Sequence, residues 1–317
     1  MEANSVIAVD IGGTKILGAK FDQKGRIEAR EKKGTKTRKG DEAAFRQLTR
    51  VIDQLWTEEG SPVQAISIGV PGVVRDGVVV FAPNMPWKEY PLQKKIQEHY
   101  GVRCFVDNDA NLSMLGEWRY GAGKNCQNLI GIFVGTGVGG GIVLNNQIYQ
   151  GATGGAGEVG HIIVSSDGPY CGCGARGCLE SLTSKNAIQK EIIAQTKRGR
   201  KSVYTDLIET DQFILKSSML KRALEEKDML TVDIMERVSQ YLGIGTASIV
   251  NLLDPEIVIF GGGIMEAVGP YLLPKIITHA QSYAILRIME KVKIELSALK
   301  DDACLYGAYA LALMGES

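Results

Sequence analysis

Glycine-rich turns that directly follow short apolar runs place the tightest constraint on how this chain can fold. The run at residues 6–9 leads into a turn at residues 10–14, after which residues 16–21 form a second apolar run. The pattern returns where residues 129–134 lead into the glycine-rich stretch 135–141. Each occurrence predicts a β-hairpin whose turn exposes backbone N–H groups, because glycine lets a ligand approach without a Cβ clash. The repetition predicts two related lobes facing one cleft.

Short apolar runs alternate with helical periodicity along the rest of the chain, which is typical of an α/β protein. The clearest helical segments are residues 42–56, 110–120, 232–253 and 270–280. No Pro- or Ser-rich linker separates the two halves of the sequence that carry the hairpins. We therefore expect two lobes joined by a hinge rather than by a long linker.

Length and charge exclude several classes of protein. The chain has 317 residues, which favours two domains over one. It carries 36 Lys plus Arg and 36 Asp plus Glu, so no net positive charge favours nucleic acid or anionic lipid. The longest apolar stretch, residues 129–144, is glycine-rich and too short for a transmembrane helix, and residues 1–10 lack the features of a secretory signal. We expect a cytoplasmic protein with neither a nucleic-acid nor a membrane partner.

The glycine clusters could bind phosphate in more than one way. A Walker loop requires Ser or Thr after Gly-Lys, and residues 123–125 read Gly-Lys-Asn. Residues 135–140 fit the spacing of a dinucleotide fingerprint, but that motif opens a helix and residues 142–144 read as a strand. A third cluster, residues 261–263, follows a buried-looking strand and suits contact with an adenosine. A plainer interpretation, that all three clusters only make tight turns, stays open.

Two aspartates follow apolar runs at positions that suit catalysis. Asp109 begins the helical segment 110–120, where a carboxylate is ordinarily an N-cap. The same position suits a general base, because a helix N-terminus favours the ionised carboxylate and such a base adds ~10²–10⁴-fold in rate. Asn108 beside it can donate to and accept from hydroxyl groups. Asp10 is placed to position hydrated Mg²⁺, which prefers carboxylate oxygens and water.

A histidine and three cysteines occur in the compact pattern H-x9-C-x-C-x4-C, at His161, Cys171, Cys173 and Cys178. Three thiolates and one imidazole fill the tetrahedral shell of Zn²⁺ and leave no position for a reacting water. The pattern therefore predicts a structural zinc. The rival interpretation is three surface cysteines beside an unrelated histidine.

Seven short motifs, taken in chain order, resemble the ROK family of sugar kinases and sugar-responsive repressors. They are Asp10-Ile-Gly-Gly-Thr-Lys15, Gly69-Val-Pro-Gly72, Asn108-Asp-Ala-Asn111, Gly135-Thr-Gly-Val-Gly-Gly-Gly141, Gly157-Glu-Val-Gly-His161, Cys171-Gly-Cys-Gly-Ala-Arg-Gly-Cys-Leu-Glu180 and Gly261-Gly-Gly263. Gly307-Ala308 also resembles the family's closing helix. The resemblance thus covers nearly the whole chain.

The resemblance implies an actin/hexokinase-like (ribonuclease H-like) α/β fold, with ATP and sugar in the cleft between two lobes. Residues 1–109 would form the N-terminal lobe, joined by a C-terminal helix at residues 303–317. Residues 110–302 would form a larger second lobe that carries the zinc-binding loop. The resemblance also implies a homodimer or homotetramer.

The implied activity is ATP- and Mg²⁺-dependent phosphorylation of a hexose, most readily glucose to glucose 6-phosphate, with Asp109 as the base. The implied sugar-binding residues are Gly72, Asn84, Asn108, Glu158, His161 and Glu180. The residues implied for the nucleotide and its Mg²⁺ are Asp10, Gly12, Gly13, Thr14, Gly135, Thr136, Gly137, Gly139, Gly261, Gly262 and Gly263. The implied zinc ligands are His161, Cys171, Cys173 and Cys178.

Alternatives remain at the level of substrate and of function. The same sugar-binding residues are expected in family members that act on N-acetylmannosamine, allose or fructose, and polyphosphate could replace ATP as donor. A sugar-sensing regulator is the non-enzymatic alternative. We disfavour it because only nine residues precede Asp10, too few for a DNA-binding domain, and because Asp10 and Asp109 are both present. Residues 198–230 have no functional interpretation.

Overall fold

The computed structural model describes residues 4–13, 15–35, 40–56, 61–83, 85–209 and 213–315. The chain divides into two compact units. Unit 1 comprises Met1–Asn125, Gly141–Gly157 and Asp301–Ser317, and unit 2 comprises Cys126–Gly140 and Glu158–Lys300. Two residues of the predicted site, Thr14 and Asn84, lie outside the described residues.

Unit 1 is built on a five-stranded mixed sheet with the order β3-β2-β1-β4-β8. Its strands are β1 (Ser5–Ile11), β2 (Lys15–Phe21), β3 (Ile27–Gly34), β4 (Val63–Val70) and β8 (Arg103–Asn108). The predicted first hairpin is confirmed, since β1 pairs with β2 in antiparallel register. β1, β4 and β8 run parallel, so their carboxyl ends lie at one edge of the sheet. That edge is where α/β proteins usually place their ligands.

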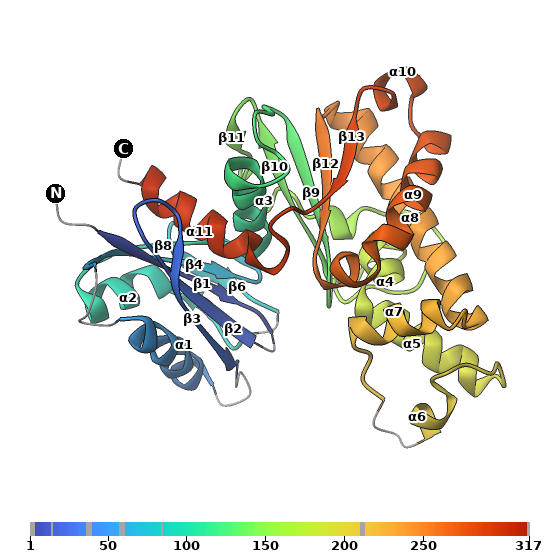
Figure 1. Cartoon of the computed structure of the whole chain (residues 1–317), viewed down its shortest axis with the longest axis horizontal. Coiled ribbons are helices and arrows are strands. Elements are labelled where there is room, and N and C mark those ends of the chain that lie inside the picture. Colours follow the sequence, from blue (N-terminus) through green and yellow to red (C-terminus); the bar gives the residue numbers. More distant parts are fainter. Residues whose placement is uncertain are drawn as a thin grey trace. The chain divides into compact units, whose positions relative to one another are not determined.

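Helices and a small second sheet surround this sheet in the described part of unit 1. The helices are α1 (Asp41–Leu55), α2 (Leu92–Tyr100), α3 (Asp109–Tyr120) and α11 (Ala303–Met314), and the small sheet consists of β5 (Val73–Arg75), β6 (Val78–Phe81) and β7 (Lys88–Tyr90). Figure 1 shows α1 and α2 on one face of the large sheet and α11 on the other. Apolar side chains of α1, including Leu48 and Ile52, are buried with Ile7 and Ile66 of the sheet in one core. This core fixes the strands whose ends carry Asp10 and Asp107.

Helix α3 packs closely on α11, which makes the extent of unit 1 differ from the expected lobe of residues 1–109. A Cβ built on Gly116 of α3 would lie 2.1 Å from the carbonyl oxygen of Ala303, and one on Gly307 of α11 would lie 1.7 Å from that of Leu112. The two backbones therefore touch. Contact of this kind groups α3 with the C-terminal helix, and unit 1 extends to Asn125 rather than ending at residue 109.

The second large sheet has the order β11-β10-β9-β12-β13. Its strands are β9 (Leu129–Val134), β10 (Val138–Leu144), β11 (Gln147–Ile148), β12 (Ile257–Gly261) and β13 (Lys293–Leu296), and the division between the units falls within β10. β12 is buried along its whole length and pairs in parallel with β9 and β13. Such burial explains its continuous apolar sequence.

The helices and 3₁₀ turns from residue 159 to residue 302 follow the second glycine turn in the sequence. They are η2 (Val159–His161), α4 (Leu179–Thr183), α5 (Lys185–Lys197), α6 (Thr205–Glu209), α7 (Ser217–Glu225), α8 (Met229–Leu253), α9 (Gly263–Tyr283), α10 (Leu286–Met289) and η3 (Lys300–Asp302). Helix α9 begins earlier than the predicted segment 270–280, although Pro270 and Pro274 lie inside it. It packs against α8 and against β9, β12 and β13.

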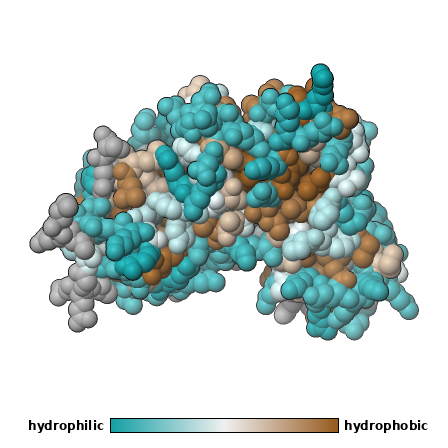
Figure 2. Space-filling view, turned by 45° about the horizontal axis from the view of Figure 1, so that its top comes forward, coloured by the Kyte–Doolittle hydropathy of each residue, from teal (hydrophilic) through white to brown (hydrophobic). Residues whose placement is uncertain are grey.

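Hydrophilic side chains cover most of the face drawn in Figure 2, and apolar side chains gather in one broad area and in smaller patches. Among the described residues, none of the helices combines the length and the apolar character that crossing a membrane requires.

Candidate active site and metal centre

The carboxyl ends of three parallel strands in unit 1 bring two aspartates to one edge of the sheet. Asp10 on β1 is in register with Gly69 on β4, and Gly69 is in register with Asp107 on β8. Asp109 comes two residues after Asp107, and a Cβ built on Gly69 would lie 3.5 Å from its Cα atom. Asp10 and Asp109, predicted from separate motifs, therefore both lie beside Gly69.

The start of α3 resolves which residue caps this helix. Asn108 is the N-cap, and its side-chain oxygen accepts hydrogen bonds from the N–H groups of Ala110 at 2.9 Å and Asn111 at 3.1 Å. Asp109 is the first residue of the helix, and its Oδ1 accepts from the Ala110 N–H at 2.8 Å. The N-cap interpretation of Asp109 is therefore wrong, because the residue before it fills that role.

Asn108 also connects the helix to the Gly69–Gly72 motif. Its Nδ2 donates a hydrogen bond to the carbonyl oxygen of Gly72 at 2.8 Å. Gly72 has a φ of 124°, and a Cβ there would lie 2.1 Å from the carbonyl oxygen of Phe81. Only glycine fits this backbone. The hydrogen bond to Gly72 therefore holds the Asn108 side chain in place beside Asp109.

Asp10 lies in an electrostatic environment dominated by burial, which raises its pKa to about 6. The Cys304 thiol and the Lys15 ammonium oppose this increase, and the Asp301 carboxylate adds to it. Lys15 itself pairs with Asp301 at 3.0 Å. A carboxylate that burial destabilises in its charged form suits a cation, because the cation would restore favourable charge.

Asp107 was not predicted from the sequence, yet it organises this edge of the sheet. Burial raises its pKa, while the Asn108 N–H, the Asn111 amide and the Gln150 amide donate to its carboxylate and oppose the shift. The Gln150 Nε2 lies 2.9 Å from Oδ2. Its position one residue before the Asn-Asp pair was the only sequence signal, and an acidic residue inside a strand does not reveal its partners.

The first glycine turn is closed by backbone and side-chain hydrogen bonds. The Gly12 N–H donates to the Lys15 carbonyl at 2.8 Å, and the Thr35 hydroxyl donates to the Gly12 carbonyl at 2.7 Å. Gly12 and Gly13 thus stand at the β1–β2 turn beside Asp10.

The second glycine turn connects β9 to β10. The Gly135 N–H donates to the Gly137 carbonyl at 2.8 Å, and the Val138 N–H donates to Oε2 of Glu180 at 2.9 Å. Thr136 lies within this turn, and Gly139 is already in the strand that follows. Because a strand and not a helix follows the turn, the dinucleotide fingerprint is excluded.

The third glycine cluster stands at the same edge of the second sheet. Gly261 ends β12 in register with Phe133 of β9, Gly262 is the N-cap of α9, and Gly263 begins that helix. Gly262 has a φ of 85°, and a Cβ there would lie 2.7 Å from the Val134 carbonyl oxygen. A helix N-terminus therefore opens next to the second turn, which is an arrangement suited to an anion.

The predicted metal ligands come together. The ligand atoms of His161, Cys171, Cys173 and Cys178 all lie within 4.8 Å of one another. Nδ1 of His161 is 3.7 Å from the Cys171 sulfur, and the sulfurs of Cys173 and Cys178 are 3.7 Å apart. Four converging N and S donors match the preference of Zn²⁺. Burial raises the pKa of Cys171 and of Cys178, so a bound cation would be needed to keep both as thiolates.

The remaining predicted sugar residues stand around this cluster. Nε2 of His161 points to Glu158, with 3.8 Å between the nitrogen and Oε2. Glu180 is the second residue of α4, and one of its carboxylate oxygens accepts a hydrogen bond from the second glycine turn. Unit 1 thus holds Asp10, Gly12, Gly13, Gly72, Asn108 and Asp109, whereas unit 2 holds residues 135–140 and 261–263, Glu158, Glu180 and the metal ligands.

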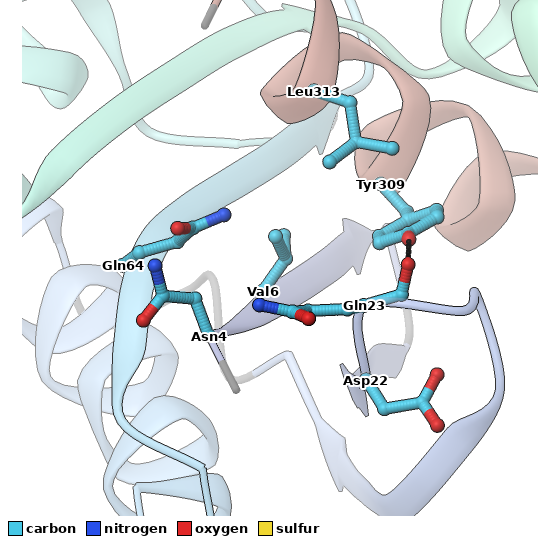
Figure 3. A pocket seen from close by; sticks show the side chains of 7 residues that line it. All are labelled: Asn4, Val6, Asp22, Gln23, Gln64, Tyr309 and Leu313. Carbon is cyan, nitrogen blue, oxygen red and sulfur yellow. Dashed lines mark hydrogen bonds between the residues drawn. The ribbon is translucent and has the colours of Figure 1, made fainter. Parts of the chain in front are cut away.

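A separate small pocket in unit 1 lies at the opposite end of β1 from Asp10. Its volume is about 210 Å³, and its lining includes Asn4, Gln64 and Tyr309. Figure 3 shows these side chains and the hydrogen bond from the Tyr309 hydroxyl to the Gln23 carbonyl oxygen, 3.2 Å long. The pocket shares no residue with the predicted site.

The fold and the two groups of site residues define an α/β protein with paired glycine turns and a Cys/His cluster. A family model described as the ROK family matches residues 6–314, and the chain belongs to this family. A solved ROK family glucokinase from Streptomyces griseus, in complex with glucose and AMPPNP, is 33% identical with a TM-score of 0.85, covering 98% of this chain and 100% of that one. The fold is therefore actin/hexokinase-like, as expected.

Relatives of both functional types match nearly the whole chain. A protein named glucokinase from Halalkalibacterium halodurans is 32% identical over 320 residues, which cover 98% of this chain and 96% of the relative. A protein named xylose repressor from Caldicellulosiruptor bescii is 31% identical over 319 residues, which cover 98% of this chain and 79% of the relative. Overall identity thus does not separate a kinase from a regulator.

Proposed function

We propose that this protein is a sugar kinase that transfers the γ-phosphoryl group of ATP to a hexose hydroxyl, with glucose as the first candidate. The observation that carries the proposal is the position of Asp109, which begins α3 beside the strand end that bears Asp10 while Asn108 makes the helix cap. The Streptomyces griseus relative, whose structure contains glucose and AMPPNP, supports the choice of substrates.

In the proposed reaction Asp109 accepts the proton of the attacking sugar hydroxyl. Asn108, held by Gly72, together with Glu158, His161 and Glu180, would orient the sugar through hydrogen bonds. Phosphoryl transfer depends mainly on positioning and on neutralising charge, so the protein needs little other chemistry. Asn84 is proposed for the same pocket from the sequence alone.

Backbone N–H groups of the two glycine turns would bind the phosphates, and residues 261–263 would contact the adenosine. Asp10 is the residue proposed to hold the Mg²⁺ of Mg·ATP through water, and that ion would neutralise charge that develops on the phosphates. Zinc on His161, Cys171, Cys173 and Cys178 would be structural, because four protein donors leave no open position.

A sugar-responsive regulator is the second candidate, favoured by the match of nearly the whole chain to a xylose repressor. Turnover discriminates between the two functions. We would measure ADP release from Mg·ATP with glucose, mannose, fructose, allose, N-acetylglucosamine and N-acetylmannosamine, and would repeat the series with polyphosphate as donor.

Asp109→Asn provides the matched control, because the amide keeps the shape of the carboxylate and cannot act as a base. We expect turnover on one preferred sugar, and a loss of about 10²–10⁴-fold in kcat in the variant with sugar binding retained. Near-full turnover in Asp109→Asn would exclude this base. Saturable sugar binding without turnover on any sugar would favour the regulator.

A further inference from the structure

The carboxylate of Glu180 contacts both the second glycine turn and the metal-binding loop. Its Oε2 accepts the Val138 N–H at 2.9 Å, and its Oε1 lies 3.8 Å from the sulfur of Cys171. The turn fits closely against this oxygen, because a Cβ built on Gly137 would lie 2.4 Å from Oε2. One side chain therefore joins two parts of unit 2 that are distant in the sequence.

The backbone fixes Glu180 to the metal-binding loop as well. Cys178 is the N-cap of the short helix α4, and Glu180 is the second residue of that helix. The Ser181 backbone N–H donates to the Cys178 carbonyl at 3.0 Å, a bond that does not depend on the Ser181 side chain. A metal that holds the Cys178 sulfur would therefore also hold the helical turn from which Glu180 extends.

The opposite side of the glycine turn is held by the same segment. The Lys185 N–H, at the start of α5, donates to the Gly135 carbonyl at 2.9 Å. Residues 178–185 thus hold the turn through hydrogen bonds at Gly135 and at Val138. The bond to Val138 is the stronger of the two, because its acceptor is a carboxylate.

We propose that Glu180 is a positioning residue through which the metal-binding loop sets the geometry of the glycine turn at residues 135–138. The metal is a divalent cation that prefers thiolates. Without it, the loop no longer anchors α4 and the Val138 N–H loses its partner for part of the time. The inference rests on the proposed function only in that this turn would bind the phosphates of the nucleotide.

Hydrogen exchange at the Val138 amide, measured without sugar or nucleotide, tests the inference directly. Cys173→Ser removes an exposed ligand whose sulfur does not contact Glu180 in the described structure. We expect Val138 to exchange roughly ten- to a hundredfold faster in Glu180→Ala, the factor that loss of a hydrogen bond to a charged group implies, and to a smaller extent in Cys173→Ser, where the bond is lost for part of the time. In the double variant we expect the rate of Glu180→Ala and no further increase, because both changes act through one bond.

The control is Ser181→Ala, which alters the same helix and leaves both contacts of Glu180 in place; its Val138 amide should exchange at the wild-type rate. Amides of β12 report whether the unit as a whole remains folded. Wild-type exchange in Cys173→Ser, or an additive increase in the double variant, would overturn the proposal. If Cys173→Ser fails to fold, the same comparison is made between metal-loaded and chelated wild-type protein.

Binding of AMPPNP, measured by calorimetry without sugar, adds an independent readout. We expect it to weaken in both Cys173→Ser and Glu180→Ala, more strongly in Glu180→Ala, and to stay unchanged in Ser181→Ala. If the wild-type protein binds no AMPPNP, the proposed kinase function fails, and the exchange rates still decide the role of Glu180. Unchanged AMPPNP binding in Glu180→Ala would overturn the link between this residue and the nucleotide.

Discussion

The buried carboxylate of Asp10 suits the binding of a cation, but it lowers the stability of the folded protein when no cation is bound. Burial raises its pKa to about 6 from an ordinary value of 3.8. Between these two pH values the folded protein binds more protons than the unfolded chain, so stability falls as pH rises through this window. The full shift corresponds to at most about 3 kcal/mol.

We therefore predict that Asp10→Asn stabilises the metal- and nucleotide-free protein by about 1–3 kcal/mol at pH 7.5. The gain should fade as pH falls toward 4, where the wild-type carboxyl of the folded state is protonated and no buried negative charge remains. Urea denaturation between pH 4 and pH 8 measures it. Asp76→Asn, at an exposed position, should show no such pH-dependent gain. Equal stability of Asp10→Asn and wild type at pH 7.5 would contradict the assigned cause.

At the candidate site, the clustering of the predicted metal ligands follows from the sequence more readily than the individual hydrogen bonds do. The spacing of the cysteines and His161 predicted a cluster that the structure brings together. The sequence does not reveal the role of Asp107, because its hydrogen bond with Gln150 joins residues far apart in the chain. The contact of Glu180 with Val138 cannot be read from the sequence for the same reason, because a strand, a loop and a helix must fold before the two residues meet.

At the scale of elements, the pairing of α3 with α11 decides where unit 1 ends. A glycine inside a helix ordinarily weakens it by roughly 1 kcal/mol relative to alanine, so Gly116 and Gly307 read as neutral or unfavourable in the sequence. In the structure each glycine lets a backbone carbonyl of the other helix approach. Local propensity could not reveal this, and the expected boundary at residue 109 missed it.

Gly307→Ala tests this packing. Helix propensity alone predicts a gain of roughly 1 kcal/mol, whereas the Cβ would lie 1.7 Å from the Leu112 carbonyl oxygen and must force the helices apart. We expect the clash to dominate, with a net loss of about 1–3 kcal/mol in chemical denaturation. Gly263→Ala is the control, since the nearest atom to its Cβ would be 3.7 Å away. A stabilised Gly307→Ala would show that the helices separate easily.

Across the whole molecule, the two glycine turns are supported differently. The turn of unit 1 is held by its own strands and by Thr35, whereas that of unit 2 depends on residues 178–185, which follow the metal ligands. The repeated hairpin pattern was readable from the sequence, because it depends on local residue types. The difference in support was not, since it depends on contacts made by a distant loop.

This difference predicts that metal removal affects the two units unequally. After chelation we expect a calorimetric transition assigned to unit 2 to move down by at least about 5 °C, because a metal bound only by the folded state stabilises it and its loss removes that free energy. The transition of unit 1 should stay in place.

Elemental analysis before chelation should give about one zinc per chain, the ratio that one four-donor site sets. Cys173→Ser should reproduce the chelated profile, whereas Cys126→Ser, which alters a cysteine outside the cluster, should match wild type. Equal shifts of both transitions would show instead that the metal stabilises the chain as one cooperative body.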